Sequence, residues 1–313
     1  MSARRANIAI AAALIFAGGI LLSLTIGATD GYDPQVFWLL RVPRTVSAIA
    51  VGGALAVAGA LIQASMGNPL AEPYTIGIAS AAALGAVVGK LLPTHPLASS
   101  GVAALIFGMG AISLLAAWVR RGFRGPTDVL LAGVVLGFFC TSLATLLMAL
   151  MDPATWASAM FWILGSLGSL SLSESVAALT FLIITSCIGW LHWKPLDLMS
   201  VDDLTAEAAG VDVPAFRKRI FFLVAILTAV SVSVAGVIGF VGLVVPHTLR
   251  RLGIRNHAAL IPLCFLTGAG LLLCSDVAAR VVVRPSEIPV GVIMALVGAP
   301  FFLWIVRGQR SPS

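Results

Sequence analysis

The sequence predicts an all-α, polytopic membrane protein with about ten transmembrane helices, in a single domain that covers residues 1–313. Hydrophobic residues make up 59% of the chain and charged residues only 10%, too few to keep a soluble domain dispersed. Apolar runs of about twenty residues, the length that a bilayer-spanning helix needs, recur along the whole chain. The basic residues lie mainly in short connections between these runs, which is typical of a membrane protein and not of a nucleic-acid-binding one.

The apolar runs place the expected spans, in order, at residues 6–28, 43–65, 74–92, 98–119, 129–151, 175–193, 220–249, 258–282 and 288–306. The first run follows two arginines as a signal peptide would, but it is longer than the apolar core of one and is interpreted as the first span. The segments GAVVG (85–89) and GVVLG (133–137) have the small-xxx-small spacing that lets membrane helices pack closely.

The run from 220 to 249 would be about 45 Å long as one helix, against a hydrocarbon core of about 30 Å. Basic clusters flank it at 217–219 and at 250–255, so a single span would put one cluster outside. A hairpin that breaks near Gly236, with two short arms, keeps both clusters on one side, as the positive-inside rule prefers. Irregular backbone at membrane depth is tolerated only where protein or a water-filled cavity shields it, so the hairpin also indicates a segment beside a pathway. The hairpin gives ten spans, and a single span is the alternative.

With ten spans and both termini in the cytoplasm, most of the nineteen Lys and Arg residues fall on the cytoplasmic side. Those expected outside are Arg41, Arg44, Lys90, Arg280 and Arg284. Asp276 and Arg280 are four residues apart within one span, so they share a helix face and are expected to pair. Arg41 and Arg44 flank a proline at the outer start of the second span. They could snorkel to lipid headgroups or bind carboxylates of a soluble partner.

Two connections are longer than the others. Residues 152–174 are expected outside, and their aromatic residues mixed with Gly and Ser suit a short helix at the membrane interface. Residues 194–219 are expected inside, where Ser200 or Asp202 can cap a short helix, Gly210 can end it and Pro214 can open another. A capped helix–turn–helix on the cytoplasmic face is an expected contact for another protein.

The turn GNPLAEPYTIG (67–77) separates two apolar runs. Its two prolines remove backbone donors and disfavour helix at the residues before them, so the chain must break here. Asn68 can bond back to the freed backbone and tighten the turn. Glu72 fits two roles equally well, as a cap within the turn or as a contact to a cytoplasmic partner.

The residues assembled so far resemble the FecCD-type permeases, the membrane subunits of bacterial ABC importers for iron–siderophores, haem and vitamin B12. The most distinctive block is LRVPRTVSAIAVGGALAVAGALIQASMGNPLAEPYTIGIASAAALGA (40–86). The similarity continues, in family order and over nearly the whole chain, through LLAGVVLG (130–137), FWILGSL (161–167), AEAAGVDV (206–213), GVIGFVGLVVPHTLR (236–250) and SEIPVGVIMALVGAPFFLWIV (286–306).

The resemblance implies a type II ABC importer permease in the bacterial inner membrane, surrounded by lipid and acting as a homodimer. A cytoplasmic ABC ATPase dimer would bind ATP and Mg²⁺, so this chain itself would hold no cofactor or metal and would not be an enzyme. A periplasmic binding protein would deliver the cargo, and no nucleic acid is involved. Residues 198–216 match the family's coupling helices, and the residues implied there are Asp202, Asp203, Glu207, Ala209 and Gly210.

Two further sets of residues follow from the resemblance. Arg41, Arg44 and Arg280 match arginines that dock the binding protein, where such pairs steer and orient the encounter. Asn68 and Leu70 match a cytoplasmic gate, and Thr127 matches a second part of it, although GPTD here replaces the adjacent hydroxyl residues of the family. Ferric siderophore is the expected cargo, with vitamin B12 or haem as the alternative. An ion-coupled secondary transporter is a more distant alternative, because it needs ionisable residues near the membrane midplane.

Overall fold

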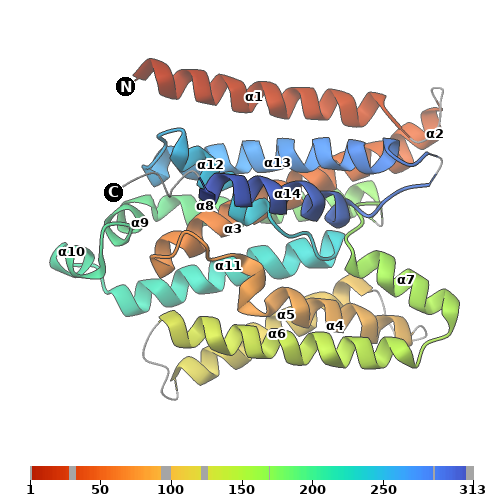
Figure 1. Ribbon diagram of the computed structural model, residues 1–313, viewed down its shortest axis with the longest axis horizontal. Coiled ribbons are helices and arrows are strands. Elements are labelled where there is room, and N and C mark those ends of the chain that lie inside the picture. Colours follow the sequence, from red (N-terminus) through yellow and green to blue (C-terminus); the bar gives the residue numbers. More distant parts are fainter. Residues whose placement is uncertain are drawn as a thin grey trace.

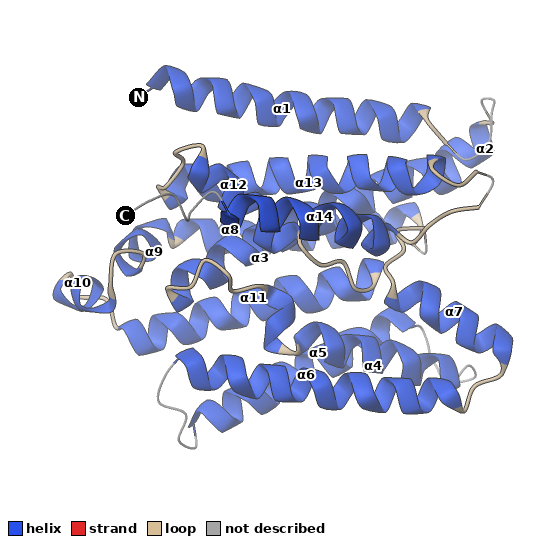
Figure 2. Cartoon of the chain, viewed as in Figure 1, coloured by secondary structure: helices blue, strands red, loops and turns tan. Residues whose placement is uncertain are grey.

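The computed structural model describes residues 2–27, 33–92, 100–120, 126–168, 170–284 and 286–307. Within these ranges the secondary structure is entirely helical (Figure 2). The helices are α1 (Ser2–Thr25), α2 (Pro34–Val36), the π-helix η1 (Phe37–Arg41), α3 (Val42–Met66), the 3₁₀-helix η2 (Pro73–Ile76), α4 (Ile78–Leu91), α5 (Ser100–Arg120), α6 (Pro126–Ala149), α7 (Pro153–Ile163), α8 (Leu172–Leu191), α9 (Trp193–Met199), α10 (Asp203–Ala208), α11 (Val213–Ala235), α12 (Val241–Arg251), α13 (His257–Val281) and α14 (Val290–Arg307).

Six of the described helices are long and apolar enough to cross a bilayer, namely α1, α3, α6, α8, α11 and α13. Three shorter apolar helices, α4, α5 and α14, bring the count to nine. The 11-residue α12 packs against α3 and α13 beside them. The all-helical, polytopic fold is confirmed, and the tenth span stays a prediction. The helices run side by side, with α9 and α10 at one end of the molecule and α7 at the other (Figure 1). These are named the α10 end and the α7 end, and α1 begins and α14 finishes at the α10 end.

The run 220–249 breaks as predicted, but its two arms are unequal. α11 is a full-length helix of 23 residues that ends where Gly236 takes a φ of 68°, and α12 has only 11 residues. Both outer ends of this pair return to the end of α3, because Arg217 binds the Ser65 carbonyl and Arg250 binds Gln63. The expectation of two short arms was therefore wrong: a full span is followed by a loop that re-enters the bundle and a half-length helix.

α3 is the central helix, with 89% of its most apolar stretch buried, whereas α1 lies on the outside with 17% buried. Small residues make this possible, because lipid is as apolar as a protein core and membrane helices gain mainly by close packing. A Cβ atom on Gly59 would meet the backbone of Gly242, and one on Gly52 would meet the Gly268 carbonyl. The glycines of GAVVG and GVVLG also pack closely, Gly85 against α5 and the second motif against Gly77.

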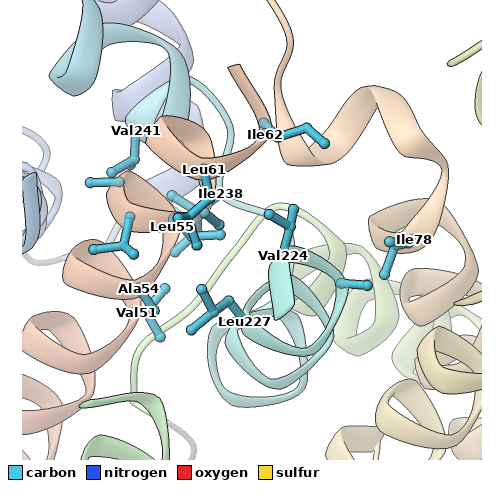
Figure 3. Packing of buried hydrophobic residues seen from close by; sticks show 14 of the residues in the cluster. Val51, Ala54, Leu55, Leu61, Ile62, Ile78, Val224, Leu227, Ile238 and Val241 are labelled. Atoms are coloured by element: carbon cyan, nitrogen blue, oxygen red, sulfur yellow. The ribbon is translucent and has the colours of Figure 1, made fainter. Parts of the chain in front are cut away.

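Branched and aliphatic side chains fill the space between these close approaches. Leu55 and Leu61 of α3 lie with Ile238 and Val241, and Val224 and Leu227 point toward them from α11 (Figure 3). The loop between α11 and α12 is thus part of the core. The expected interfacial helix in 152–174 is α7, which Asp152 caps and on which Trp156 and Phe161 are exposed.

Candidate functional site

The turn after α3 is tightly closed by its own side chain. α3 ends at Gly67, whose φ of 59° needs a residue without a Cβ. The Asn68 side-chain oxygen accepts a hydrogen bond from the Leu70 amide at 2.9 Å, and the Asn68 carbonyl accepts from the Ala71 amide at 3.1 Å. This confirms the predicted bond from Asn68 to the backbone. Leu70 itself projects outward and is 53% exposed.

The second half of the turn holds the loop between α11 and α12. The Glu72 carboxylate accepts from the Phe240 amide at 2.7 Å, and the Tyr74 hydroxyl accepts from the Ile238 amide at 2.7 Å. Backbone donors left unpaired at membrane depth cost several kcal/mol each, so these two side chains make the re-entrant loop possible. The observed contact of Glu72 is with a different helix, because its carboxylate binds the amide of the residue before α12. A contact of Glu72 with a cytoplasmic partner stays a prediction.

α3 and α12 are joined by a buried polar contact. The Gln63 side-chain amide donates to the Gly242 carbonyl at 3.0 Å, and its oxygen accepts from the Arg250 guanidinium. Arg250 also reaches the Ala60 carbonyl at 3.4 Å. The start and the end of α12 are thereby attached to the last turns of α3, directly before the Asn68 turn.

α10 is connected to the same place through Arg217. Its Nη2 lies 2.9 Å from both carboxylate oxygens of Asp203, and its Nε donates to the Ser65 carbonyl at 2.7 Å. Asp203 belongs to α10, Arg217 to α11, and Ser65 lies three residues before Asn68. α10 is therefore connected to the end of α3, directly before the turn, through two hydrogen-bonded contacts. We name Asp203, Arg217 and Ser65 the α10–α3 link.

The rest of the predicted coupling segment forms the exposed surface of α10 and its flanks. Asp202 caps α10 by accepting from the Thr205 amide at 2.6 Å, and the hydrogen bonds from Thr205 lower the pKa of the Asp202 carboxyl. Val201 is 70% and Leu204 77% exposed. Glu207, Ala209 and Gly210 are also exposed, and Gly210 ends the helix with a φ of 85°. The predicted capping by Asp202 and ending at Gly210 are both confirmed.

At the α7 end, three arginines bind the last carbonyls of α1 and those of the two residues that follow it. Arg41 donates to Leu24 and Thr25, Arg280 to Ser23 and Ile26, and Arg284 to Gly27, at 2.8 to 3.3 Å. Cations at a helix C-terminus complement both its unpaired carbonyls and its dipole. Arg41 is 9% and Arg280 3% exposed, so both face into the protein.

Arg44 and Arg280 share the fully buried carboxylate of Asp276. Arg44 lies 2.8 Å and Arg280 3.1 Å from it, which confirms the predicted pair on α13. Arg44 also pairs with Glu287 at 2.7 Å, and Glu287 is 44% exposed. The last of the five residues expected outside, Lys90, donates to the Ser158 hydroxyl at 2.9 Å. All five of these basic residues thus have partners within the chain.

The structure brings Asn68 and Leu70, expected at the gate, and Asp203, expected in the coupling segment, together at the α10 end. Arg41, Arg44 and Arg280, expected to dock the binding protein, lie at the α7 end. Thr127 lies in the first turn of α6, and its side chain is outside the described residues. Among the described residues, no group of three or more His, Cys, Asp or Glu side chains could hold a metal ion.

Residues that sequence reasoning did not single out complete the site. Gln63, Tyr74 and Arg250 tie the turn and α12 together, and Arg217 had been counted only as part of a basic cluster. The available signal was Gln63, a lone amide in the apolar run 43–65, since a buried polar side chain in a membrane needs a partner.

Comparisons with known proteins identify the family of the chain. The model of the FecCD transport family matches residues 6–308. The vitamin B12 import system permease protein BtuC of Serratia proteamaculans is 36% identical over 288 residues, which are 90% of this chain and 85% of that protein. BtuC of Klebsiella pneumoniae is 35% identical over 279 residues, 88% of this chain and 84% of that protein.

Two solved structures of transporters have a similar fold. A metal-chelate type ABC transporter in an inward-facing conformation superposes with a TM-score of 0.87 at 30% identity, covering 96% of this chain and 99% of that one. PsaBC from Streptococcus pneumoniae has a TM-score of 0.59 at 19% identity, covering 85% and 90%, and supports the fold alone. The family match, the relatives and the fold together show that the chain belongs to the FecCD transport family and is a membrane permease of the ABC importer type.

Proposed function

We propose that this chain is the translocation subunit of an importer that carries a metal chelate across the bacterial inner membrane. It works as a homodimer with a cytoplasmic ABC ATPase dimer, which binds ATP and Mg²⁺, and with a periplasmic binding protein. The α10 end and both termini face the cytoplasm, and the α7 end faces the periplasm. The observation that carries the proposal is the α10–α3 link, which connects an exposed cytoplasmic helix to the turn at the expected gate.

The cargo we propose is a cobalt corrinoid of the vitamin B12 type. Ferric siderophore was the expectation from the sequence, but the relatives with 35–36% identity are named for vitamin B12 import. These relatives favour vitamin B12, the alternative cargo, over ferric siderophore. Haem is the next competitor, because it is also a large planar chelate.

In the proposed cycle, ATP binding brings the two ATPase subunits together and displaces α10. The exposed residues around it, including Val201, Leu204 and Glu207, form the contact surface. Asp203 and Arg217 transmit the displacement to the end of α3, and the Asn68–Leu70 turn moves with it. Gln63 and Arg250 carry the same movement into α12, so the turn and the re-entrant loop shift together. The result is a two-state equilibrium biased by a remote ligand.

Docking of the binding protein is proposed for the α7 end, through Arg41, Arg44 and Arg280. Arg44 is the most accessible of the three, with a side chain 13% exposed and paired to the half-exposed Glu287. A carboxylate from the binding protein would replace Glu287 at Arg44. Arg41 and Arg280 are buried, bind the carbonyls at the end of α1 and would add positive electrostatic potential to this surface. Such charges steer association over a distance.

An ion-coupled mechanism is disfavoured by the partners of the buried carboxylates. Asp276 pairs with two arginines, and Glu72 accepts from the Phe240 amide. A carboxylate that exchanges ions during a transport cycle must be able to release its partner, and each of these holds structure that the fold depends on.

The cargo is tested with the complete importer in proteoliposomes, loaded with ATP and supplied with its binding protein. Uptake of radiolabelled cyanocobalamin is measured in competition with a ferric hydroxamate and with haemin. We expect cyanocobalamin to be taken up and the other two, at tenfold excess, to leave its uptake unchanged. Uptake of the ferric hydroxamate in preference to cyanocobalamin would overturn the corrinoid proposal and restore the siderophore expectation.

A further inference from the structure

A groove of about 460 Å³ lies between α8 and α11 at the α10 end. Its walls are Ile188 and His192 of α8, and Lys218, Arg219, Phe222 and Leu223 of α11. On the side toward α10, the His192 ring lies against the Phe216 ring at a centroid distance of 5.7 Å. None of these residues belongs to the gate, the coupling surface or the docking site described above.

Both walls change from polar to apolar over one helical turn. On α11, Lys218 and Arg219 lie at the α10 end, and Phe222 and Leu223 follow four residues deeper into the membrane span. On α8, which runs in the opposite direction, Ile188 lies one turn deeper than His192. The groove itself is lined by apolar surface, to which Lys218 and Arg219 contribute their hydrocarbon stems, and their charged ends give it a cationic mouth at the α10 end. A phospholipid, with a headgroup above acyl chains, has the same order.

The charges at the mouth are exposed on Lys218 and Arg219. Among the residues that the structure describes, no carboxylate forms an ion pair with Lys218 or Arg219. The nearby acidic side chains are used elsewhere: Asp203 binds Arg217, and Asp212 caps α11 through the Ala215 amide. Two exposed cations without carboxylate partners give this mouth a net positive charge, which suits an anionic ligand.

The surroundings identify the source of that ligand as the membrane. Phe222 is 42% and Ile188 40% exposed, and further large apolar side chains of α8, Ile184 at 55% and Leu191 at 70%, are exposed beside them. A surface of this kind on two membrane-spanning helices is covered by acyl chains. A soluble phosphate compound has no acyl chain that could cover the apolar surface of the groove.

We propose that this groove binds one anionic glycerophospholipid from the cytoplasmic leaflet, with its phosphate against Lys218 and Arg219 and an acyl chain along Phe222 and Leu223. Arg217, the residue before Lys218, belongs to the α10–α3 link. The lipid therefore fixes the end of α11 next to the contact that transmits the movement of α10. The proposal depends on the membrane topology and not on which cargo is carried.

The test is native mass spectrometry of the full-length chain in detergent, titrated with dioleoyl phosphatidylglycerol or with dioleoyl phosphatidylcholine. The double variant K218Q/R219Q removes the two mouth charges. The variant R251Q/R255Q removes two exposed charges from the same end but outside the groove and is the matched control. K218R/R219K keeps both charges and checks that side-chain replacement itself does no harm. Elution as a single species in size exclusion establishes that each variant is folded.

We expect one phosphatidylglycerol per chain to bind more tightly than phosphatidylcholine. K218Q/R219Q should weaken it about 25-fold, at roughly fivefold per basic residue near the membrane surface. R251Q/R255Q and K218R/R219K should bind as the unmodified chain does. An equal loss in both glutamine variants would mean diffuse surface charge and would overturn the proposal. Equal binding of the two lipids would also overturn it, as would displacement of phosphatidylglycerol by millimolar inorganic phosphate.

Discussion

Removing the Arg217 side chain should uncouple ATP hydrolysis from transport. Arg217 makes a charged hydrogen bond to the Ser65 carbonyl at 2.7 Å and a two-pronged pair with Asp203 at 2.9 Å. The first contact is worth about 1.5–3 kcal/mol. The second adds only about 0.2–1 kcal/mol, because the Asp203 side chain is 51% exposed and water screens the pair. The link as a whole therefore stabilises by about 2–4 kcal/mol.

If about half of that free energy differs between the two states of the gate, its loss reduces coupling about tenfold, since 1.4 kcal/mol is one factor of ten. We expect R217A to lower the cargo taken up per ATP hydrolysed by about tenfold while the basal ATPase rate stays near normal. D203N should lower it only twofold to threefold. R217K keeps the charge but offers one nitrogen in place of the Nε and Nη2 that reach Ser65 and Asp203, so it should lie in between.

The assay measures uptake and phosphate release in the same proteoliposomes, with K194A as the control. Lys194 is an exposed cation of α9 in the same cytoplasmic segment, and its ammonium lies over the Trp193 ring instead of in the link. The double variant D203N/R217A should behave like R217A alone, because the two residues act through one contact. Normal uptake per ATP in R217A, or strictly additive losses in the double variant, would refute the link.

Three further outcomes follow from other contacts. G59A should lower the melting temperature of the detergent-solubilised chain, because overpacking against the Gly242 backbone costs about 1–3 kcal/mol. A melting temperature equal to that of the unmodified chain would show that α3 and α12 do not touch. Hydrogen bonds from Thr205 lower the pKa of Asp202, so the α10 cap is intact above the ordinary aspartate pKa and is lost as pH falls through the lowered value. D202A should therefore expose the Thr205 amide to hydrogen exchange at neutral pH. Unchanged protection of that amide would exclude the cap. R44E should weaken docking of the binding protein at low salt at least tenfold and leave membrane insertion intact, whereas unchanged affinity would remove Arg44 from the docking site.

The sequence was sufficient for the architecture because hydropathy and the distribution of charge act locally. The break at Gly236 followed from the length of one apolar run and from basic clusters at both of its ends. The unequal arms did not follow, because the length of α12 depends on Glu72 and Tyr74, more than 160 residues away, which satisfy the Ile238 and Phe240 amides. No local pattern reports such a partner.

In the candidate site, too, local features could be predicted and long-range contacts could not. Asp202 and Gly210 were predictable as a cap and a terminator, since both act within one helical turn. Arg217 looked like one more positive-inside residue, and only the fold places it between Asp203 and Ser65. Of the partners of the five basic residues expected at the outer face, only Asp276 was predicted, for Arg280, because the two lie on one helix face. The carbonyls that bind Arg41, Arg280 and Arg284 could not be foreseen, because the end of α1 meets these residues only in three dimensions.

The central claim, that this permease is driven by a separate ATPase through α10, is tested most directly by cargo uptake into proteoliposomes that hold the chain with and without its ATPase partner. The account predicts uptake only when the ATPase, ATP and the binding protein are all present, with no response to a proton or sodium gradient. Uptake by the chain alone, driven by an ion gradient, would contradict it.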